Sequence, residues 1–251
     1  MSSETEVVLL GVAASFIAGL ATGAGALPIL FRKRFSDRLL DALLGFAAGV
    51  MLAATAFSLI LPAIDLGGIW VTIFSLTIGA VCMHLAEHLI PHMHLISGSG
   101  GPSSHLTRTW LLMLAITLHN FPEGLAVGVS FGGGDVKEGM IIAMAIGLQN
   151  MPEGLAVALP LIRERYTRRR AIWYATLTGL VEPVGGFLGV AIVSMFQPLL
   201  PWGLAFAAGA MLFIVSHEMI PESHRKGFED EATFGLVAGF ILMMFLDTVF
   251  A

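Results

Sequence analysis

Long apolar stretches separated by short polar breaks are the feature that most constrains this chain. A helix that crosses a bilayer needs about 20 mostly apolar residues, and eight such stretches follow one another. Only 12% of the 251 residues are charged, about half the share typical of soluble domains. We therefore predict an all-α polytopic membrane protein that forms one transmembrane domain over residues 1–251. The helices are expected at about 6–31, 38–61, 68–90, 108–131, 136–160, 170–196, 199–220 and 232–250.

The basic residues predict how these eight helices are oriented. Alternate connections share one side of the membrane, and one set of connections holds twelve of the thirteen basic residues, whereas the other set holds only Lys137. Because basic loops stay in the cytoplasm, we expect that set to be cytoplasmic and both termini to lie outside. The twelve are Arg32, Lys33, Arg34, Arg38, Arg108, Arg163, Arg165, Arg168, Arg169, Arg170, Arg225 and Lys226.

One short phrase occurs twice, thirty residues apart. It reads HNFPEG at 119–124 and QNMPEG at 149–154, in the helices expected at 108–131 and 136–160. Consecutive helices run in opposite directions, so an axis in the membrane plane relates the two phrases. Three helices precede the pair and three follow it. This order predicts a 3+2+3 inverted repeat, an arrangement whose binding site lies near the bilayer midplane.

The paired phrases place costly polar groups inside apolar helices. His119, Asn120 and Glu123 share one helix face, because residues three and four apart are neighbours. Gln149, Asn150 and Glu153 repeat that geometry. A buried carboxylate is expensive unless a positive partner lies beside it. A structural hydrogen bond is the alternative explanation, but two matching copies favour a bound cation.

Two further residues extend this candidate site. Glu182 lies beside Pro183 in the helix expected at 170–196, and Met51 lies in the helix expected at 38–61. Imidazole and thioether ligands select transition metals over Ca²⁺ or Mg²⁺, so we expect a divalent transition metal. Met51 is alternatively an ordinary core methionine, since the chain holds 13 of them.

Histidines and acids gather at the expected cytoplasmic ends of two helices. His84, Glu87 and His88 match the H-x-x-E-H pattern of one metalloprotease class, so an intramembrane metalloprotease is the rival function. We favour a release route for metal, because His92 and His94 continue the series toward solvent. His217 and Glu218 lie at the end of another helix and are assigned to the same route. Solvated helix ends are the simpler alternative.

Acidic residues also mark the expected outer side. Asp65 follows the helix expected at 38–61, and Asp247 lies near the end of the helix expected at 232–250. Ser58 lies between Asp65 and the centre of its helix. We predict that these three residues form the entrance for a cation, the alternative being that they are ordinary surface groups.

At the paired phrases the sequence resembles the ZIP family of Zrt- and Irt-like divalent metal transporters. It is most similar to the compact prokaryotic branch called GufA-like, and the resemblance covers almost the whole chain. It implies a binuclear metal centre bridged by Glu123 and Glu153. One position would use Met51, His119, Glu123, Gln149 and Glu153; the other would use Asn120, Glu123, Asn150, Glu153 and Glu182.

The resemblance also implies an activity and a mechanism. Zn²⁺ would be taken up across the cell (inner) membrane, with Cd²⁺, Fe²⁺ or Mn²⁺ as other cargoes, and the protein would be a transporter rather than an enzyme. Predicted helices 1, 4, 5 and 6 would move like an elevator against helices 2, 3, 7 and 8. A homodimer is implied, and no nucleic acid. Some relatives carry an acid at the position of Asn150, and many carry histidine at that of Gln149, so we expect the His119 position to be required and the Asn120–Asn150–Glu182 position to tune transport.

Overall fold

The computed structural model describes residues 3–32, 35–94, 98–100 and 108–250. Within these ranges the protein is almost entirely helical. One antiparallel pair of short strands, β1 (His92–His94) and β2 (Gly98–Gly100), pairs His92 with Gly100. The α-helices are α1 (Ser3–Ala26), α2 (Asp37–Ala53), α3 (Leu61–Leu89), α4 (Arg108–Gly132), α5 (Val136–Arg163), α6 (Arg168–Gly179), α7 (Glu182–Met195), α8 (Leu200–Ile214), α9 (Ile220–Ser223) and α10 (Glu229–Phe250).

Four shorter helical segments join or extend these helices. Two are 3₁₀-helices, η1 (Leu27–Leu30) and η3 (Gln197–Leu199). The other two are π-helices, η2 (Ala54–Ile60) after α2 and η4 (Val215–Met219) after α8. π-Helical turns are rare and occur frequently at functional sites, and predicted site residues lie in both η2 and η4.

Six segments of the described chain are long and apolar enough to cross a membrane, fewer than the eight predicted. One of them, Asp37–Leu89, has 53 residues, about 80 Å of helix at 1.5 Å per residue. It is interrupted at Gly68, whose φ of +78° is unfavourable for any residue with a side chain. The helix expected at 170–196 is also interrupted, between α6 and α7. The helix expected at 108–131 is present as α4 but is not among the six. The eight-span arrangement stays a prediction.

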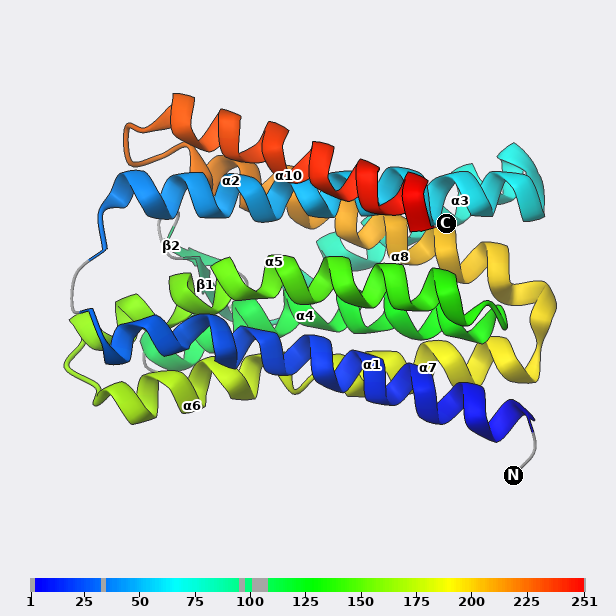
Figure 1. Cartoon of the computed structure of the whole chain (residues 1–251), viewed down its shortest axis with the longest axis horizontal. Coiled ribbons are helices and arrows are strands. Elements are labelled where there is room, and N and C mark those ends of the chain that lie inside the picture. Colours follow the sequence, from blue (N-terminus) through cyan, green and yellow to red (C-terminus); the bar gives the residue numbers. More distant parts are fainter. Residues whose placement is uncertain (1–2, 33–34, 95–97, 101–107, 251) are drawn as a thin grey trace.

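The long helices lie side by side along the longest axis of the molecule (Figure 1). α2 and α10 lie on one side, α1, α6 and α7 lie on the other, and α4 and α5 lie between them. Both chain termini point toward one end. The start of α2, the connection at 164–167 and the connection at 224–228 lie at the opposite end (Figure 1), with Arg38, Arg165 and Arg225 among their residues.

Glycines bring particular helices into backbone contact. A Cβ added to Gly124 of α4 would lie 2.0 Å from the carbonyl oxygen of Glu182 in α7. A Cβ added to Gly154 of α5 would lie 1.8 Å from the carbonyl oxygen of Thr22 in α1. Such small residues allow helix backbones to approach closely within membranes. The final glycine of each paired phrase therefore fixes its helix against a partner helix.

These backbone contacts join α1 with α5 and α6, α4 with α7, α2 with α10, and α3 with α8, and we gather these helices into two groups. The first group comprises α1, α4, α5, α6 and α7, and the second comprises α2, α3, α8 and α10 with the π-helices η2 and η4. In the second group, a Cβ on Gly49 would lie 1.9 Å from the Leu236 oxygen, and one on Gly209 would lie 2.0 Å from the Leu76 oxygen. Some of the added Cβ atoms would come within 3.0 Å of the backbone of another helix. Among the described glycines, every such contact is with a helix of the same group.

The same contacts show that residues of the first and last parts of the chain correspond to one another at a fixed separation in sequence. Gly49 with Leu236 and Gly209 with Leu76 are equivalent pairs, and each residue lies 160 positions from its counterpart. Gly239 with Phe46 and Gly79 with Phe206 repeat this offset. In the first group, the Gly154–Thr22 contact matches the Gly124–Glu182 contact, with offsets of 30 between the glycines and 160 between their partners. Residues of the two halves therefore occupy corresponding places.

Candidate metal site and pathway

The polar residues of the paired phrases are buried between α4 and α5, and both helices continue through their internal prolines. Four of these residues have no exposed surface: Asn120, Glu123, Gln149 and Asn150. Glu182, the first residue of α7, is equally buried, and Glu153 is 8% exposed. Burying so many polar groups is costly unless each one is paired.

Two hydrogen bonds join the predicted ligands. Gln149 Nε2 donates to Glu123 Oε1 at 2.5 Å, which connects α5 to α4. Asn150 Nδ2 donates to Glu182 Oε1 at 2.7 Å and to the Ala18 carbonyl oxygen at 2.9 Å, which connects α5 to α7 and α1. Because Gln149 and Asn150 are adjacent in α5, the structure places four predicted residues, Glu123, Gln149, Asn150 and Glu182, around one buried region.

The same region contains acceptor oxygens without donors. Buried polar atoms are normally hydrogen-bonded, and carboxylate and amide oxygens without donors suit a cation. Glu182 also lies in the first turn of α7, where the helix dipole favours negative charge. Within the described chain, the buried oxygens that lack a hydrogen bond here are Asn120 Oδ1, Glu123 Oε2, Gln149 Oε1, Asn150 Oδ1 and Glu182 Oε2.

Met51 lies near the end of α2, in the second group of helices. It is 1% exposed and belongs to an apolar cluster with Ala126 of α4 and Ile146 of α5. The π-helix η2 begins three residues later. Met51 therefore belongs to the layer of side chains through which the second group contacts the paired-phrase helices.

The two π-helices contain predicted site residues and are followed by prolines. Ser58 lies in η2, and His217 and Glu218 lie in η4. Pro62 follows η2 and Pro221 follows η4, each as the second residue of the next helix. A proline ring clashes with the carbonyl group four residues earlier in an α-helix, and the wider π-helical turn relieves this clash.

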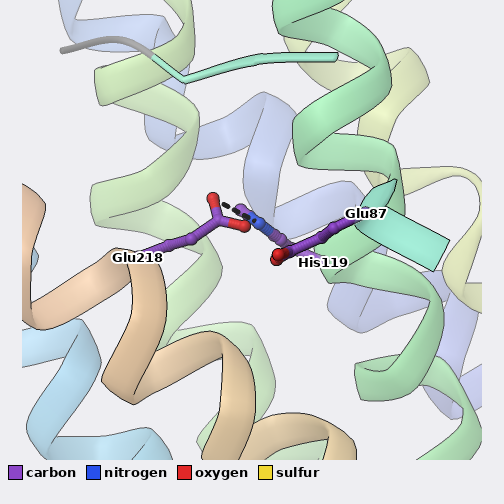
Figure 2. A group of neighbouring side chains, drawn as sticks. All are labelled: Glu87, His119 and Glu218. Atoms are coloured by element: carbon purple, nitrogen blue, oxygen red, sulfur yellow. Dashed lines mark ion pairs between the residues drawn. The ribbon is translucent and has the colours of Figure 1, made fainter. Parts of the chain in front are cut away.

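Three ionisable side chains form a compact cluster (Figure 2), in which Glu87 lies two residues before Leu89, the last residue of α3. Glu87 of α3, His119 of α4 and Glu218 of η4 offer ligand atoms that all lie within 4.8 Å of one another. His119 Nε2 lies 2.8 Å from Glu218 Oε2. All three are buried or nearly so, with side chains 4%, 13% and 5% exposed, respectively. Two carboxylates and an imidazole in this arrangement suit a divalent metal ion.

The cluster differs from the sequence prediction in two ways. His119 was assigned to the midplane site, but its imidazole contacts Glu218, which was assigned to the release route. Glu87 was considered only as part of the H-x-x-E-H pattern. The sequence offered one usable signal. Glu87 lies directly before His88, and adjacent residues of a helix point to different faces, so Glu87 and His88 need not share one environment.

The remaining predicted release residues lie around this cluster. His217 Nε2 lies 3.6 Å from Glu87 Oε2, and its ring stacks on Phe213. His92 is buried, and its Nδ1 lies 2.8 Å from the Ile90 oxygen. His84 and His88 are exposed, with ring centroids 4.2 Å apart, whereas Glu87 is buried. The side chain of His94 lies outside the part that the structure describes.

At the opposite end, the predicted entrance residues surround a small pocket. Ser58 donates a hydrogen bond of 2.5 Å to Asp247 Oδ1. Both residues line a pocket of about 160 Å³ together with Asp65 and with Glu138 of α5. Glu138 was not predicted, although its place in the first turn of the expected helix at 136–160 was a usable signal. Ile141, which also lines the pocket, belongs to an apolar cluster between α2, α5 and α10.

Comparison with known proteins identifies the family. The family model described as "ZIP Zinc transporter" matches residues 86–247. The chain is 45% identical to zinc transporter GufA of Myxococcus xanthus over 94% of this chain and 97% of that relative. It is 48% identical to zinc transporter ZIPB of Bordetella bronchiseptica over 96% and 80%, and 34% identical to human zinc transporter ZIP11 over 90% and 93%.

These relatives are transporters, so the intramembrane metalloprotease predicted as the rival function is excluded. The exposure of His84 and His88 beside a buried Glu87 agrees with that exclusion, because a metalloprotease needs both histidines on its metal. Three findings lead to one assignment: buried carboxylates in the paired phrases, the Glu87–His119–Glu218 cluster of possible metal ligands, and matches over almost the whole chain. The chain belongs to the ZIP family of zinc transporters, in its prokaryotic branch.

Proposed function

We propose that this protein carries Zn²⁺ across the cell membrane into the cytoplasm through the buried region between α4, α5 and α7. The observation that supports this most directly is the set of unpartnered acceptor oxygens on Asn120, Glu123, Gln149, Asn150 and Glu182. A cation supplies what these oxygens lack. The relatives that resemble the chain over almost its full length are named zinc transporters.

The proposed path has three stations. Zn²⁺ enters the pocket of Ser58, Asp65, Glu138 and Asp247, where carboxylates concentrate cations. It then exchanges water for the midplane ligands, in a binuclear centre bridged by Glu123 and Glu153. It leaves through the Glu87–His119–Glu218 cluster and the neighbouring histidines. The apolar cluster beside Ile141 separates the entrance from the midplane, which supports an arrangement closed toward the outside.

The two helix groups support an elevator mechanism. The midplane ligands other than Met51 belong to the first group, and the groups meet through side chains rather than through close backbone contacts. For example, a Cβ on Gly203 of α8 would approach the side chain of Val129 of α4 at 3.0 Å. Packed layers of side chains permit sliding, as in shear motions. We propose that the first group carries the metal past the second.

The constant offset of 160 residues supports the predicted 3+2+3 inverted repeat. We propose that Asp37–Leu89 crosses the membrane twice, with its turn at Gly68, and that α4 also crosses. This gives eight spans with the basic end in the cytoplasm and both termini outside. Transport of Cd²⁺, Fe²⁺ and Mn²⁺ and assembly as a homodimer remain predictions from the family resemblance.

Zinc uptake by proteoliposomes containing the purified protein tests the proposal. Glu123→Ala and Glu153→Ala should each abolish uptake, because each removes a carboxylate from the proposed bridge. Glu229→Ala is the matched control, since Glu229 is exposed at the start of α10 and should leave uptake unchanged. Normal uptake by both bridge variants would overturn the site assignment, and absence of flux in the unaltered protein would overturn the function.

A further inference from the structure

One buried hydroxyl differs from all the others that the structure describes. Eight serine and threonine side chains are buried, and seven of them donate to a backbone carbonyl oxygen. A buried hydroxyl on a helix normally bonds in this way to a carbonyl of the preceding turn. Thr22 of α1 has no exposed surface, and its Oγ1 makes no hydrogen bond to the described residues. An unpaired buried hydroxyl is destabilising, so its retention calls for an explanation.

Thr22 occupies the place that corresponds to Glu182. α1 crosses the end of α6, just before α7 begins at Glu182, at Gly19 and Gly179, where a Cβ on either glycine would lie 2.2 Å from the carbonyl oxygen of the other. The Gly19 Cβ would lie 3.4 Å from Glu182 Oε1, and the Gly179 Cβ would lie 2.8 Å from Thr22 Oγ1. Each glycine thus makes room for the polar atom opposite it. Thr22 and Glu182 therefore face the same crossing from opposite sides.

The surroundings of Thr22 also connect it to the proposed second metal position. A threonine in a helix would normally donate its hydroxyl hydrogen to the carbonyl oxygen one turn earlier, and for Thr22 this is the carbonyl oxygen of Ala18. That carbonyl accepts a hydrogen bond of 2.9 Å from Asn150 Nδ2, which also donates to Glu182 Oε1 at 2.7 Å. The carbonyl oxygen one turn before Thr22 thus belongs to a network in which Asn150 Oδ1 and Glu182 Oε2 are buried acceptors without hydrogen bonds.

We propose that Thr22 is a further oxygen donor of the metal position formed by Asn120, Asn150 and Glu182. This inference rests on the proposed transport function. That position contains oxygen ligands only, and the Thr22 hydroxyl adds one more, whereas the sequence resemblance assigned the His119 imidazole and the Met51 thioether to the other position. Oxygen ligands suit harder divalent ions such as Mn²⁺. Thr22 therefore contributes to the preference of this position for hard ions over soft ones.

Replacement of the hydroxyl by a methyl group tests this role. Thr22→Val keeps the shape of the side chain, and the binding of Mn²⁺ and of Zn²⁺ to the detergent-solubilised full chain would be measured by calorimetry. We expect the weaker of two binding events to lose about tenfold in Mn²⁺ affinity, as for other changes around metal sites, while the stronger zinc event persists. Thr22→Ser should retain the unaltered values. Ser15→Ala is the control, because Ser15 lies two turns away on α1 and its hydroxyl bonds to the Gly11 oxygen.

A thiol at the same position provides a second readout. Thr22→Cys should bind Cd²⁺ with an ultraviolet thiolate-to-metal absorption band, whereas Ser15→Cys and the unaltered protein, with Cys82 alone, should show none. This test decides the matter if Thr22→Val does not fold. Zinc transport in the unaltered protein together with unchanged Mn²⁺ binding in Thr22→Val, or no cadmium band in Thr22→Cys, would overturn the role of Thr22 while leaving the transport function intact. A failure of zinc flux in the unaltered protein would instead overturn the proposed function.

Discussion

The two helix groups differ in the residues that they carry and agree in how they are held together. The first group carries the midplane polar residues, and the second carries both π-helices with Ser58, Asp65, Asp247, Glu87 and Glu218. Inside each group, glycines bring backbones together, and between the groups side chains meet. Backbone contact through small residues makes each group rigid. In the proposed elevator mechanism the first group would move as one body, and most residues at the two ends of the pathway would belong to the second group.

Two ion pairs of the described chain connect the groups: Arg163 of α5 lies 3.7 Å from Asp37 of α2, and His119 contacts Glu218. His119 lies on α4 of the first group, and its Nε2 lies 2.8 Å from Glu218 Oε2 of the second. Glu87 of the second group completes the same cluster. At the outer end, by contrast, Ser58 and Asp247 both belong to the second group, and they bond to each other. The Glu87–His119–Glu218 cluster therefore joins the two groups by an ion pair, whereas the Ser58–Asp247 hydrogen bond does not cross the boundary between them.

A disulfide between the groups should have the largest effect. In a Cys82→Ala background, Val129→Cys with Gly203→Cys joins α4 to α8, and the Gly203 Cβ would lie 3.7 Å from the Val129 Cβ, within the disulfide range. Oxidation should stop zinc flux into proteoliposomes, and a reducing agent should restore it.

The matched pair lies within the first group. Gly11→Cys with Val190→Cys joins α1 to α7, and the Gly11 Cβ would lie 3.3 Å from the Val190 Cβ. Its oxidation should leave flux unchanged if α1 and α7 move together. Full flux through the oxidised 129–203 pair, with cross-linking verified by mass spectrometry, would show that the groups need not slide.

The inner and outer ends can next be compared at corresponding residues, Glu218 and Ser58. Glu218→Gln should reduce the rate of zinc uptake about tenfold or more, because it removes a charged ligand from a buried cluster. Ser58→Ala should reduce it about twofold at most, because Asp247 lines a pocket that water can enter. Uptake rates at saturating zinc would be measured for both, with thermal unfolding as a check on folding. Equal effects would remove the distinction between the two ends.

Packing inside the first group can be tested by two glycines of one helix. Gly154→Ala should lower the free energy of unfolding by about 3 kcal/mol, since its Cβ would lie 1.8 Å from the Thr22 oxygen and α1 must shift. A Cβ added to Gly147 would have no neighbouring atom closer than 3.8 Å. Gly147→Ala should therefore raise the free energy of unfolding by up to about 1 kcal/mol, because alanine favours the helix over glycine. Unfolding in detergent would be followed by circular dichroism. A stable Gly154→Ala would contradict the interlocked packing of α1 and α5.

Much of this arrangement was predictable from residue pattern alone. The buried environment of Glu123, Asn150 and Glu182 followed from their places in apolar helices. In the structure, hydrogen bonds join Gln149 to Glu123 and Asn150 to Glu182. The paired phrases also indicated that α4 and α5 share one region. These features depend on local spacing and on the cost of burying charge, and both can be read directly from a sequence.

Other features depend on how distant segments meet. The π-helices η2 and η4 arise where a proline meets a packed helix, and no residue pattern predicted them. The contact between His119 and Glu218 depends on the relative position of the two groups, which a sequence does not specify. Thr22 escaped notice because a threonine in a helix is ordinary, and only its missing hydrogen bond and its correspondence with Glu182 distinguish it.

The smallest expected effect concerns the charge of the outer pocket. Asp247→Asn lowers the number of carboxylates among Asp65, Glu138 and Asp247 from three to two but keeps a group that can accept a bond from Ser58. Because such charges mainly raise the local cation concentration, the KM for zinc should rise about threefold at low salt while kcat stays the same. The difference should disappear at high salt, where exposed charges are screened.

Glu138→Gln makes the same change of charge on the first group. If both residues only attract cations, the two variants should behave alike. If Glu138 accompanies the metal as α5 moves, its variant should lower kcat as well and keep that defect at high salt, because screening does not replace a ligand. Parallel titrations of uptake rate against zinc at two salt concentrations separate these outcomes. A kcat defect in Asp247→Asn alone would assign the transfer step to the second group and reverse the roles inferred for the two groups.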